Sequence, residues 1–385
     1  MRLGIDRINE KEIINIFKGK RVGLITNPTG INSKHTSSIE VLNKKVNLVA
    51  LFSPEHGIRG NIQAGVSLDT YVDEATNITV YSLFGKTHKP TKEMLDNLDI
   101  LAIDIQDVGS RFYTYLYTMS HAMEACKEFN KDFVVFDRPN PINSIDFEGN
   151  ILDMKYKSFV GGYPILQRYG MTMGEVSRLF NEEFGIGCNL KVIEMKGYKR
   201  EMFYNDTKKI WVVPSPNIPS LSSAIVYNAT CQFEGTNISE GRGTTTPFEV
   251  VGAPFISPND LSSKLNSLNL KGIYFRPLYF TPTFSKYKDE LCGGVFLHVT
   301  NKKIFEPVKT GWTMVYVIRE MYKDKFVINP SKSERPTFFD LEAGCPYLSC
   351  EEYSLEYLYK LLDSDKEKFS KIREKYLIYW LWKKK

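Results

Sequence analysis

The first half of the chain alternates short apolar runs with amphipathic segments, and this alternation limits the possible folds more than any other feature. Amphipathic segments that predict helices lie at residues 35–43, 91–98 and 113–129. The apolar, β-rich runs that predict strands lie at residues 21–26, 46–52, 79–83, 100–105 and 133–136. Strands that alternate with helices in this way form a parallel sheet covered on both faces. We therefore expect an α/β fold with a Rossmann-like, doubly wound sheet.

The second half of the chain predicts a different architecture. Thr172 and Glu175 form a capping box that predicts a helix ending near Phe184, and a strand follows at 189–195. Residues 198–252 lose regular periodicity and are rich in Pro and Gly, as in a long functional connection. The later expected elements are helices at 258–268, 309–322, 354–362 and 366–376 and strands at 272–280 and 294–300.

These elements predict two domains. Residues 1–250 are expected to form a Rossmann-like catalytic domain, and residues 251–385 a smaller α+β auxiliary domain that closes the cleft. Three aromatic residues near the C-terminus, Tyr379, Trp380 and Trp382, are expected to dock on the body of the protein.

One strand end carries an acid, an imidazole and a guanidinium. The strand at 46–52 is followed by Ser-Pro-Glu-His-Gly, in which Pro54 ends the strand because it cannot donate to a sheet. Glu55 and His56 then lie just past the carboxyl end of the strand, with Arg59 close behind them. Ligands of open α/β sheets bind at this edge, so the loop is an active-site candidate.

Three further strand ends are polar as well. They are the segments 26–30, 104–111 and 137–141. Because the carboxyl ends of parallel strands lie along one rim, their acids, arginines and asparagines are expected to converge there. The Gly-rich segment 231–245 adds two acids and an arginine that could cover a small molecule.

Composition and missing motifs exclude several classes of protein. A net charge of +5 over 385 residues gives no basis for nucleic-acid binding. Six cysteines without a C-x-x-C pair argue against zinc, and we expect neither a metal nor an organic cofactor. The phosphate loops G-x-G-x-x-G and G-x-x-x-x-G-K-[ST] and the G-x-S-x-G elbow are absent. Without a secretory apolar stretch or a membrane span, a cytoplasmic location is expected.

Paired carboxyl groups at such a rim suit the cleavage of glycosidic bonds. One group protonates the leaving oxygen while another stabilises or captures the oxocarbenium-like centre. Glu55 is the expected acid. Retaining, inverting and substrate-assisted courses stay open, because they depend on distances that a sequence does not contain.

Five motifs together resemble one family. The chain is similar to the exo-β-N-acetylmuramidases, once classed as DUF1343, over nearly its whole length, at segments 19–30, 53–60, 104–115, 137–141 and 233–244. The resemblance implies a Rossmann-like domain, a smaller domain, a cleft between them, and release of N-acetylmuramic acid from the non-reducing ends of peptidoglycan fragments. It assigns catalysis to the Glu of the Ser-Pro-Glu-His-Gly loop, which is Glu55 here. The rival interpretation is a non-catalytic protein that binds muropeptides or sugars on the same scaffold.

The resemblance and the strand ends together give a set of candidate residues. The expected partners are peptidoglycan-derived disaccharides and muropeptides. The catalytic candidates are Glu55, His56 and Asp107. The substrate-binding candidates are Asn27, Arg59, Asp104, Arg111, Tyr113, Asn140, Glu234, Asn237, Glu240 and Arg242.

N-acetylmuramic acid differs from N-acetylglucosamine by a lactyl group with a carboxylate. An arginine is the expected partner, because its planar guanidinium can bind a carboxylate through two hydrogen bonds. Arg59 and Arg111 are the expected partners, and Arg242 is the next candidate. Arg138, between Asp137 and Pro139, is expected to form a structural ion pair instead.

Overall fold

The computed structural model describes residues 1–55, 57–59, 70–85, 87–331 and 334–379. A seven-stranded sheet with the order β3-β4-β2-β1-β5-β6-β9 forms the first domain. All neighbouring strands are parallel except β3, which runs antiparallel along the edge. The strands are β1 (Arg21–Thr26), β2 (Asn47–Ser53), β3 (Tyr71–Asp73), β4 (Ile78–Ser82), β5 (Ile100–Asp104), β6 (Asp132–Phe136) and β9 (Asn189–Ile193).

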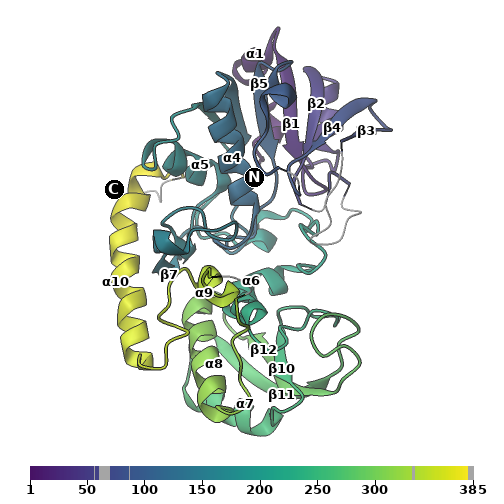
Figure 1. Ribbon diagram of the computed structural model, residues 1–385. Helices are drawn as coiled ribbons and strands as arrows, with labels where there is room; N and C mark the ends of the chain where they lie inside the picture. Colours follow the sequence, from purple (N-terminus) through teal and green to yellow (C-terminus); the bar gives the residue numbers. More distant parts are fainter. Residues whose placement is uncertain (56, 60–69, 86, 332–333, 380–385) are drawn as a thin grey trace.

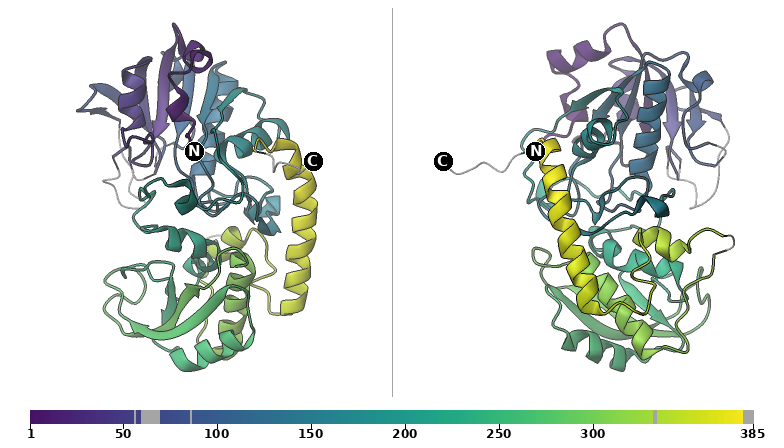
Figure 2. Two further views of the ribbon diagram at one scale, coloured as in Figure 1. Left: turned by 180° about the vertical axis from the view of Figure 1, so that it is seen from behind. Right: turned by 60° about the vertical axis from the view of Figure 1, so that its left-hand side comes forward.

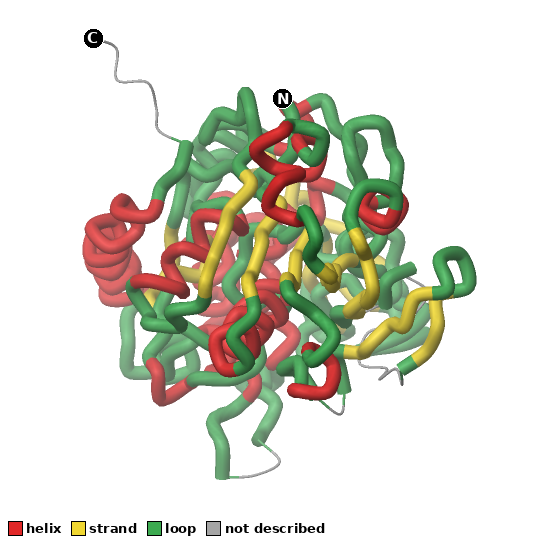
Figure 3. Tube along the Cα trace, turned by 90° about the horizontal axis from the view of Figure 1, so that it is seen from above, coloured by secondary structure: helices red, strands yellow, loops and turns green. Residues whose placement is uncertain are grey.

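Helices cover both faces of this sheet, as the view from above shows (Figure 3). Side chains alternate along the strands, so that Leu24 joins the apolar core on one face and Ile25 the core on the other. The helices are α1 (Lys11–Phe17), α2 (Ser38–Asn43), α3 (Lys92–Leu95), α4 (Tyr115–Glu128) and α5 (Met173–Glu182). The doubly wound sheet expected from the sequence is confirmed, and so is the capping box of Thr172 and Glu175.

A smaller α+β domain lies beneath the first (Figure 1). Its antiparallel sheet has the order β10-β12-β11. Its elements are α6 (Leu221–Thr230), β10 (Val250–Ala253), α7 (Pro258–Ser267), β11 (Ile273–Phe280), β12 (Cys292–Val299), α8 (Pro307–Met321) and α9 (Phe338–Ala343). Gly311 lets α8 approach α6 closely, because a Cβ there would lie 2.1 Å from the carbonyl oxygen of Ala229.

Short elements complete the fold. A two-stranded antiparallel sheet joins β7 (Glu148–Ile151) to β8 (Leu166–Arg168). The 3-10 helices are η1 (Ile5–Arg7), η2 (Met154–Tyr156), η3 (Tyr204–Thr207), η4 (Cys231–Gly235) and η5 (Glu374–Tyr376).

Two expectations about secondary structure were wrong. Helix α6 lies inside the segment expected to be irregular; Ser220 caps it, accepting from the amide of Ser223. The two expected C-terminal helices form a single helix, α10 (Leu355–Arg373). Its buried stripe runs unbroken through the Asp-Ser-Asp segment at 363–365, because Asp365 accepts a hydrogen bond from the amide of Ile151 at 3.0 Å.

Helix α10 runs along one side of the molecule from the second domain to the first (Figure 2). At its end, Arg373 donates to the carbonyl oxygens of Ser144 and Gly170. Tyr379 then donates its hydroxyl to Asp137 at 2.7 Å, so the expected docking of this residue is confirmed. Trp380 and Trp382 lie outside the described residues.

Replacing Tyr379 with Phe should destabilise the fold. The hydroxyl donates to Asp137 and accepts from the amide of Met195 at 2.7 Å. Its loss leaves the Met195 amide without a partner and removes one donor from the buried Asp137, which keeps its bond from Thr172. We expect a loss of about 1–3 kcal/mol in the free energy of unfolding, measured by urea denaturation. The exposed Tyr357 provides the control, Tyr357→Phe. Equal stability of the two variants would contradict docking of the C-terminus.

Candidate active site

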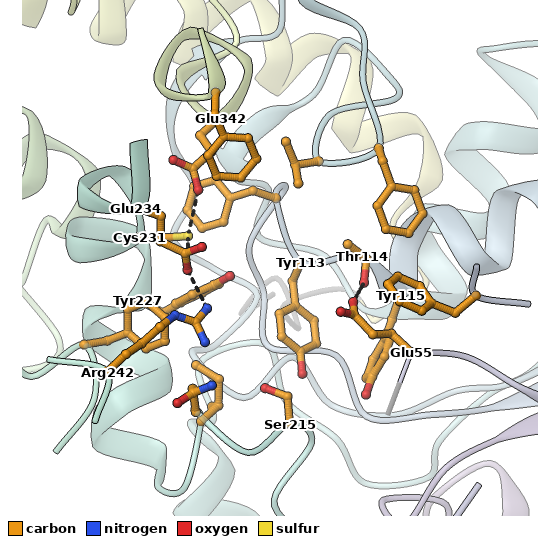
Figure 4. Close-up of a pocket in the computed structure, with 18 residues that line it drawn as sticks. Glu55, Tyr113, Thr114, Tyr115, Ser215, Tyr227, Cys231, Glu234, Arg242 and Glu342 are labelled. Carbon is orange, nitrogen blue, oxygen red and sulfur yellow. Dashed lines mark hydrogen bonds and ion pairs between the residues drawn. The ribbon is translucent and has the colours of Figure 1, made fainter. Parts of the chain in front are cut away.

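A cavity of about 270 Å³ lies where the two domains meet. Figure 4 shows Glu55 and the aromatic residues around it on one side and an acid–arginine cluster on the other. Eighteen residues line the cavity: Glu55, Phe84, Phe112, Tyr113, Thr114, Tyr115, Phe159, Val160, Ser215, Asn217, Ile218, Tyr227, Cys231, Glu234, Arg242, Phe248, Phe338 and Glu342.

Glu55 reaches the cavity from the end of β2. The strand ends at Ser53, and Gly57 closes the following turn in the left-handed region, with φ of 80° and its amide donating to Pro54 at 3.3 Å. Thr114, just before α4, donates its hydroxyl to Glu55 at 3.2 Å. The partly buried Glu55 carboxyl is therefore held beside the N-terminus of a helix.

Aromatic rings form the wall beside Glu55. Tyr113 packs edge-on against Tyr115, with ring centroids 4.8 Å apart, and also against Tyr227. Tyr115 donates its hydroxyl to the carbonyl of Pro214 at 2.6 Å and accepts from the amide of Asn27 at 2.7 Å. Asn27 therefore positions a lining residue and is not itself part of the lining. Such a wall can pack against the apolar face of a sugar ring.

The opposite wall carries the acid–arginine cluster. Arg242 donates to Glu234 at 2.7 Å, and its Nε lies 3.3 Å from Glu240. The thiol of Cys231 lies 3.7 Å from Glu234 and 3.5 Å from Glu342. Burial, followed by the charge of Glu234, raises the pKa of Glu342 well above its usual value. Burial also raises the pKa of Glu234, although Arg242 acts against this.

Cys231, Glu234 and Glu342 could in principle hold a metal ion, because their ligand atoms lie within 4.8 Å of one another. Two features argue against a cation here. Arg242 already neutralises Glu234, and burial keeps the pKa of the Cys231 thiol well above its usual value, so the thiolate ligand is disfavoured. The absence of a metal and a cofactor stays a prediction.

Four of the candidate residues line the cavity: Glu55, Tyr113, Glu234 and Arg242. His56 lies outside the described residues. The expected convergence along the rim is therefore only partial, because the other candidates that the structure describes do not line the cavity.

The candidates on the later strand ends are buried and lie outside the cavity lining. Asp104 pairs with Arg138 at 2.6 Å and accepts from Ser38, so the expected structural ion pair of Arg138 is confirmed. Asp107 accepts from the Tyr169 hydroxyl and from the amide of Gly109 at 2.7 Å, and burial raises its pKa to about 7. None of these side chains lines the cavity.

Three further candidates bind the backbone or a second layer of side chains. Asn140 donates to the carbonyl of Met171, and Asn237 donates to that of Lys325. Glu240 is 2% exposed and lies behind Arg242, where it pairs with Lys286 at 2.9 Å.

The structure does not place either expected lactyl partner in the cavity lining. Arg59 pairs with Asp73 at 2.9 Å, and its side chain is 43% exposed. Arg111 is 0% exposed and donates to four backbone carbonyl oxygens, which belong to Asn150, Ile165, Glu342 and Ala343. Of the candidate arginines that the structure describes, Arg242 alone lines the cavity.

Sequence reasoning missed several lining residues. Thr114 follows Tyr113 within the family motif at 104–115. Ser215 and Asn217 lie in a Pro-rich turn within the connection at 198–252. Glu342 gave no signal, because α9 was not predicted and nothing in its local sequence marks an acid that faces a cavity.

The fold and cavity define a two-domain α/β protein whose carboxyl-lined pocket draws residues from both domains. Two family models match it in succession: Exo-beta-N-acetylmuramidase NamZ, N-terminal, over residues 22–222, and its C-terminal counterpart over residues 225–379. The chain belongs to this exo-β-N-acetylmuramidase family, so the family expected from the sequence motifs is confirmed. The domain boundary expected at residue 250 stays a prediction.

Named relatives agree with this assignment. The chain is 51% identical over 368 residues to the peptidoglycan β-N-acetylmuramidase NamZ of Bacillus subtilis (strain 168), covering 94% of this chain and 88% of the relative. The crystal structure of a DUF1343 family protein from Bacteroides fragilis NCTC 9343 superposes with a TM-score of 0.91 at 38% identity, covering 98% of this chain and 99% of the other. A second DUF1343 protein from that strain gives a TM-score of 0.77 at 32% identity, with 98% of each chain covered.

Replacing Arg138 with Met should destabilise the protein strongly. The change leaves the fully buried Asp104 without its cation, which costs about 3–5 kcal/mol in the free energy of unfolding. The control is Arg59→Met, because this more exposed pair with Asp73 should contribute no more than about 1 kcal/mol. Urea denaturation of both variants provides the measurement, and similar small losses would show that the Asp104 pair is not structural.

Proposed function

We propose that Glu55 is the general acid of this exo-β-N-acetylmuramidase, which releases N-acetylmuramic acid from the non-reducing ends of peptidoglycan fragments. The position of Glu55 carries the proposal: it lines the cavity at the carboxyl end of β2, held there by Thr114. Catalytic groups of open α/β sheets gather at this edge.

The chemistry needs a proton, a cavity and water. Glu55 donates a proton to the glycosidic oxygen as the bond to the anomeric carbon breaks, and positive charge develops on the sugar ring. Water then supplies a hydroxyl group to the anomeric carbon and the proton that restores Glu55. The aromatic wall of Tyr113 and Tyr115 packs beside the reacting sugar, where it excludes bulk water.

We further propose that the substrates are disaccharides and muropeptides derived from peptidoglycan and that the enzyme acts in the cytoplasm. All six cysteines are free, and five of them are buried, as is usual in a reducing compartment. Among the described residues, no helix combines the length and apolarity needed to cross a bilayer.

Release of a chromophore from an N-acetylmuramide, with little release from the matching N-acetylglucosaminide, tests the activity. Replacing Glu55 with Gln should lower kcat on the muramide by about 10²–10⁴-fold, because Gln cannot donate the proton. The exposed Glu40→Gln in the same domain is the control. A Glu55→Gln enzyme that keeps its kcat would assign the proton transfer to another residue.

Arg242 is the proposed partner of the lactyl carboxylate. Its described ion pairs use Nη2 and Nε, so Nη1 remains to bind an anion that enters the cavity. The same guanidinium lies over the Phe248 ring at 5.1 Å, which fixes its plane.

Replacing Arg242 with Met should weaken transition-state binding of the muramide by roughly 2–5 kcal/mol, measured from kcat/KM. Binding of N-acetylglucosamine, which lacks the lactyl group, should change far less. Arg242→Lys keeps the charge but loses the fork, and should give an intermediate loss in a folded protein. Arg59→Met is the matched comparison. A larger loss of kcat/KM in Arg59→Met than in Arg242→Met would show that Arg59, as expected from the sequence, binds the lactyl carboxylate.

A further inference from the structure

The lining of the cavity divides by exposure into an inner end and an open end. Five aromatic side chains of the lining are no more than 8% exposed: Phe112, Tyr113, Tyr115, Tyr227 and Phe248. Four apolar residues of the lining are half-buried or exposed: Phe84, Phe159, Val160 and Phe338. The cavity volume of about 270 Å³ lies below the roughly 300–1,000 Å³ of pockets for drug-sized ligands, so it suits a single sugar. The rest of a longer substrate must then lie at the open end.

Phe159 and Val160 form the tip of a tight turn at the open end. Ser158 and Gly161 pair through two backbone hydrogen bonds of 2.8 and 3.2 Å, which makes Phe159 and Val160 the two central residues of the turn. Such positions are usually occupied by Gly, Pro, Asn, Asp or Ser. The turn itself therefore does not explain two apolar side chains at a tip that is only partly buried.

Phe84 packs beside this tip. The ring centroids of Phe84 and Phe159 lie 6.1 Å apart, and the ring of His88 packs against Phe159 at 4.3 Å. The Ser82 hydroxyl donates to the carbonyl of Phe84 at 2.9 Å and accepts from its amide at 3.2 Å, so the backbone of Phe84 is fixed. The two phenyl rings form a continuous apolar surface at the edge of the cavity, and such surfaces mark ligand-binding sites.

The same surface lies on the side of the proposed proton donor. Glu55 follows β2 and Phe84 follows β4, and these neighbouring parallel strands end level with each other, with Ser53 paired to Ser82. A general acid protonates the oxygen of the leaving group, so the leaving group lies on the side of Glu55. Arg242, the proposed partner of the lactyl carboxylate, lies across the cavity (Figure 4).

We propose, on the basis of the function proposed above, that Phe84 and Phe159 bind the sugar on the leaving side of the scissile bond. The apolar C–H face of this sugar packs on the two phenyl rings, while N-acetylmuramic acid fills the inner end of the cavity. In a peptidoglycan disaccharide the leaving sugar is N-acetylglucosamine. Its binding at the rings holds the glycosidic oxygen beside Glu55, where the proton is needed.

Kinetics on the disaccharide N-acetylmuramyl-β-1,4-N-acetylglucosamine, compared with inhibition by N-acetylmuramic acid alone, test the proposal. The disaccharide occupies both ends of the cavity, whereas the monosaccharide occupies the inner end only. Phe84→Ala and Phe159→Ala should each lower kcat/KM for the disaccharide by roughly three- to tenfold, because each removes one aromatic contact. The inhibition constant of N-acetylmuramic acid should stay at its wild-type value.

Two further changes at Phe159 separate stacking on a ring from simple packing. Phe159→Tyr keeps a flat ring and should retain most of the kcat/KM for the disaccharide. Phe159→Leu keeps an apolar side chain without a ring face and should lose nearly as much as Phe159→Ala. The matched control is Phe284→Ala, which removes a ring that is 52% exposed and lies outside the cavity lining, and which should follow the wild type.

Two results would overturn the proposal. One is a wild-type kcat/KM for the disaccharide in both alanine variants. The other is an equal loss of disaccharide turnover and of N-acetylmuramic acid binding, which would show that the rings shape the inner end of the cavity or the fold. If the alanine variants do not fold, equal kcat/KM values in Phe159→Leu and Phe159→Tyr would contradict stacking.

This proposal and the proposed function fail in different ways. A wild-type protein that neither cleaves the disaccharide nor binds N-acetylmuramic acid contradicts both. A wild-type enzyme that cleaves the disaccharide no better than its Phe84→Ala and Phe159→Ala variants contradicts the leaving-side site alone. Retained kcat in Glu55→Gln, with the expected losses in the two phenylalanine variants, contradicts the assignment of the acid and supports the leaving-side site.

Discussion

The buried guanidinium of Arg111 joins the segments on which the cavity depends. Its Nη1 donates to Asn150 and Ile165, and its Nη2 donates to Glu342 and Ala343 at the end of α9. Burial lowers its pKa to about 10, so it still carries its charge at neutral pH. A cation at the C-terminal end of a helix is favourable, and four carbonyl partners compensate for its removal from water. Arg111 therefore fixes the wall that holds Glu342, without entering the cavity itself.

The acids on the two walls of the cavity differ in burial and in charge pairing. Glu55 stands beside the threonine that precedes α4 and is partly buried, so a substrate in the cavity can reach it. The opposite wall surrounds its acids with protein, and Arg242 and Lys286 compensate the charge of the ionised ones. With Glu55 as the proposed acid and Arg242 as the proposed partner of the lactyl carboxylate, proton transfer and anion recognition are assigned to separate walls of one cavity.

The sequence predicted the sheet well because buried parallel strands leave a continuous apolar signal, and β1 begins and ends where expected. It predicted the site only in part. Asp104, Arg111 and Asn140 were selected because they are polar residues near strand ends, but loops near a buried sheet also need polar groups to satisfy their backbone and to pair with one another. A sequence pattern does not distinguish polar residues that bind a ligand from those that stabilise the loops.

Glu342 lines the cavity although no sequence pattern indicated it. Its neighbours Cys231 and Glu234 lie more than a hundred residues earlier in the chain, so no local pattern contains their contact with it.

The division of the site between domains makes their relative orientation part of its chemistry. Glu55 follows β2 of the seven-stranded sheet, whereas Glu342 on the opposite wall belongs to α9 of the smaller domain. A rotation between the domains would change the separation of Glu55, the proposed proton donor, from the opposite wall, and a displacement of about 1 Å is enough to cost much of an enzyme's rate. Two connections oppose such a rotation: the contacts of Arg111 with α9, and α10, whose end is attached to the first domain through Arg373. In the proposed mechanism, the rigidity of these connections keeps the glycosidic oxygen against Glu55 while the lactyl group binds at the opposite wall.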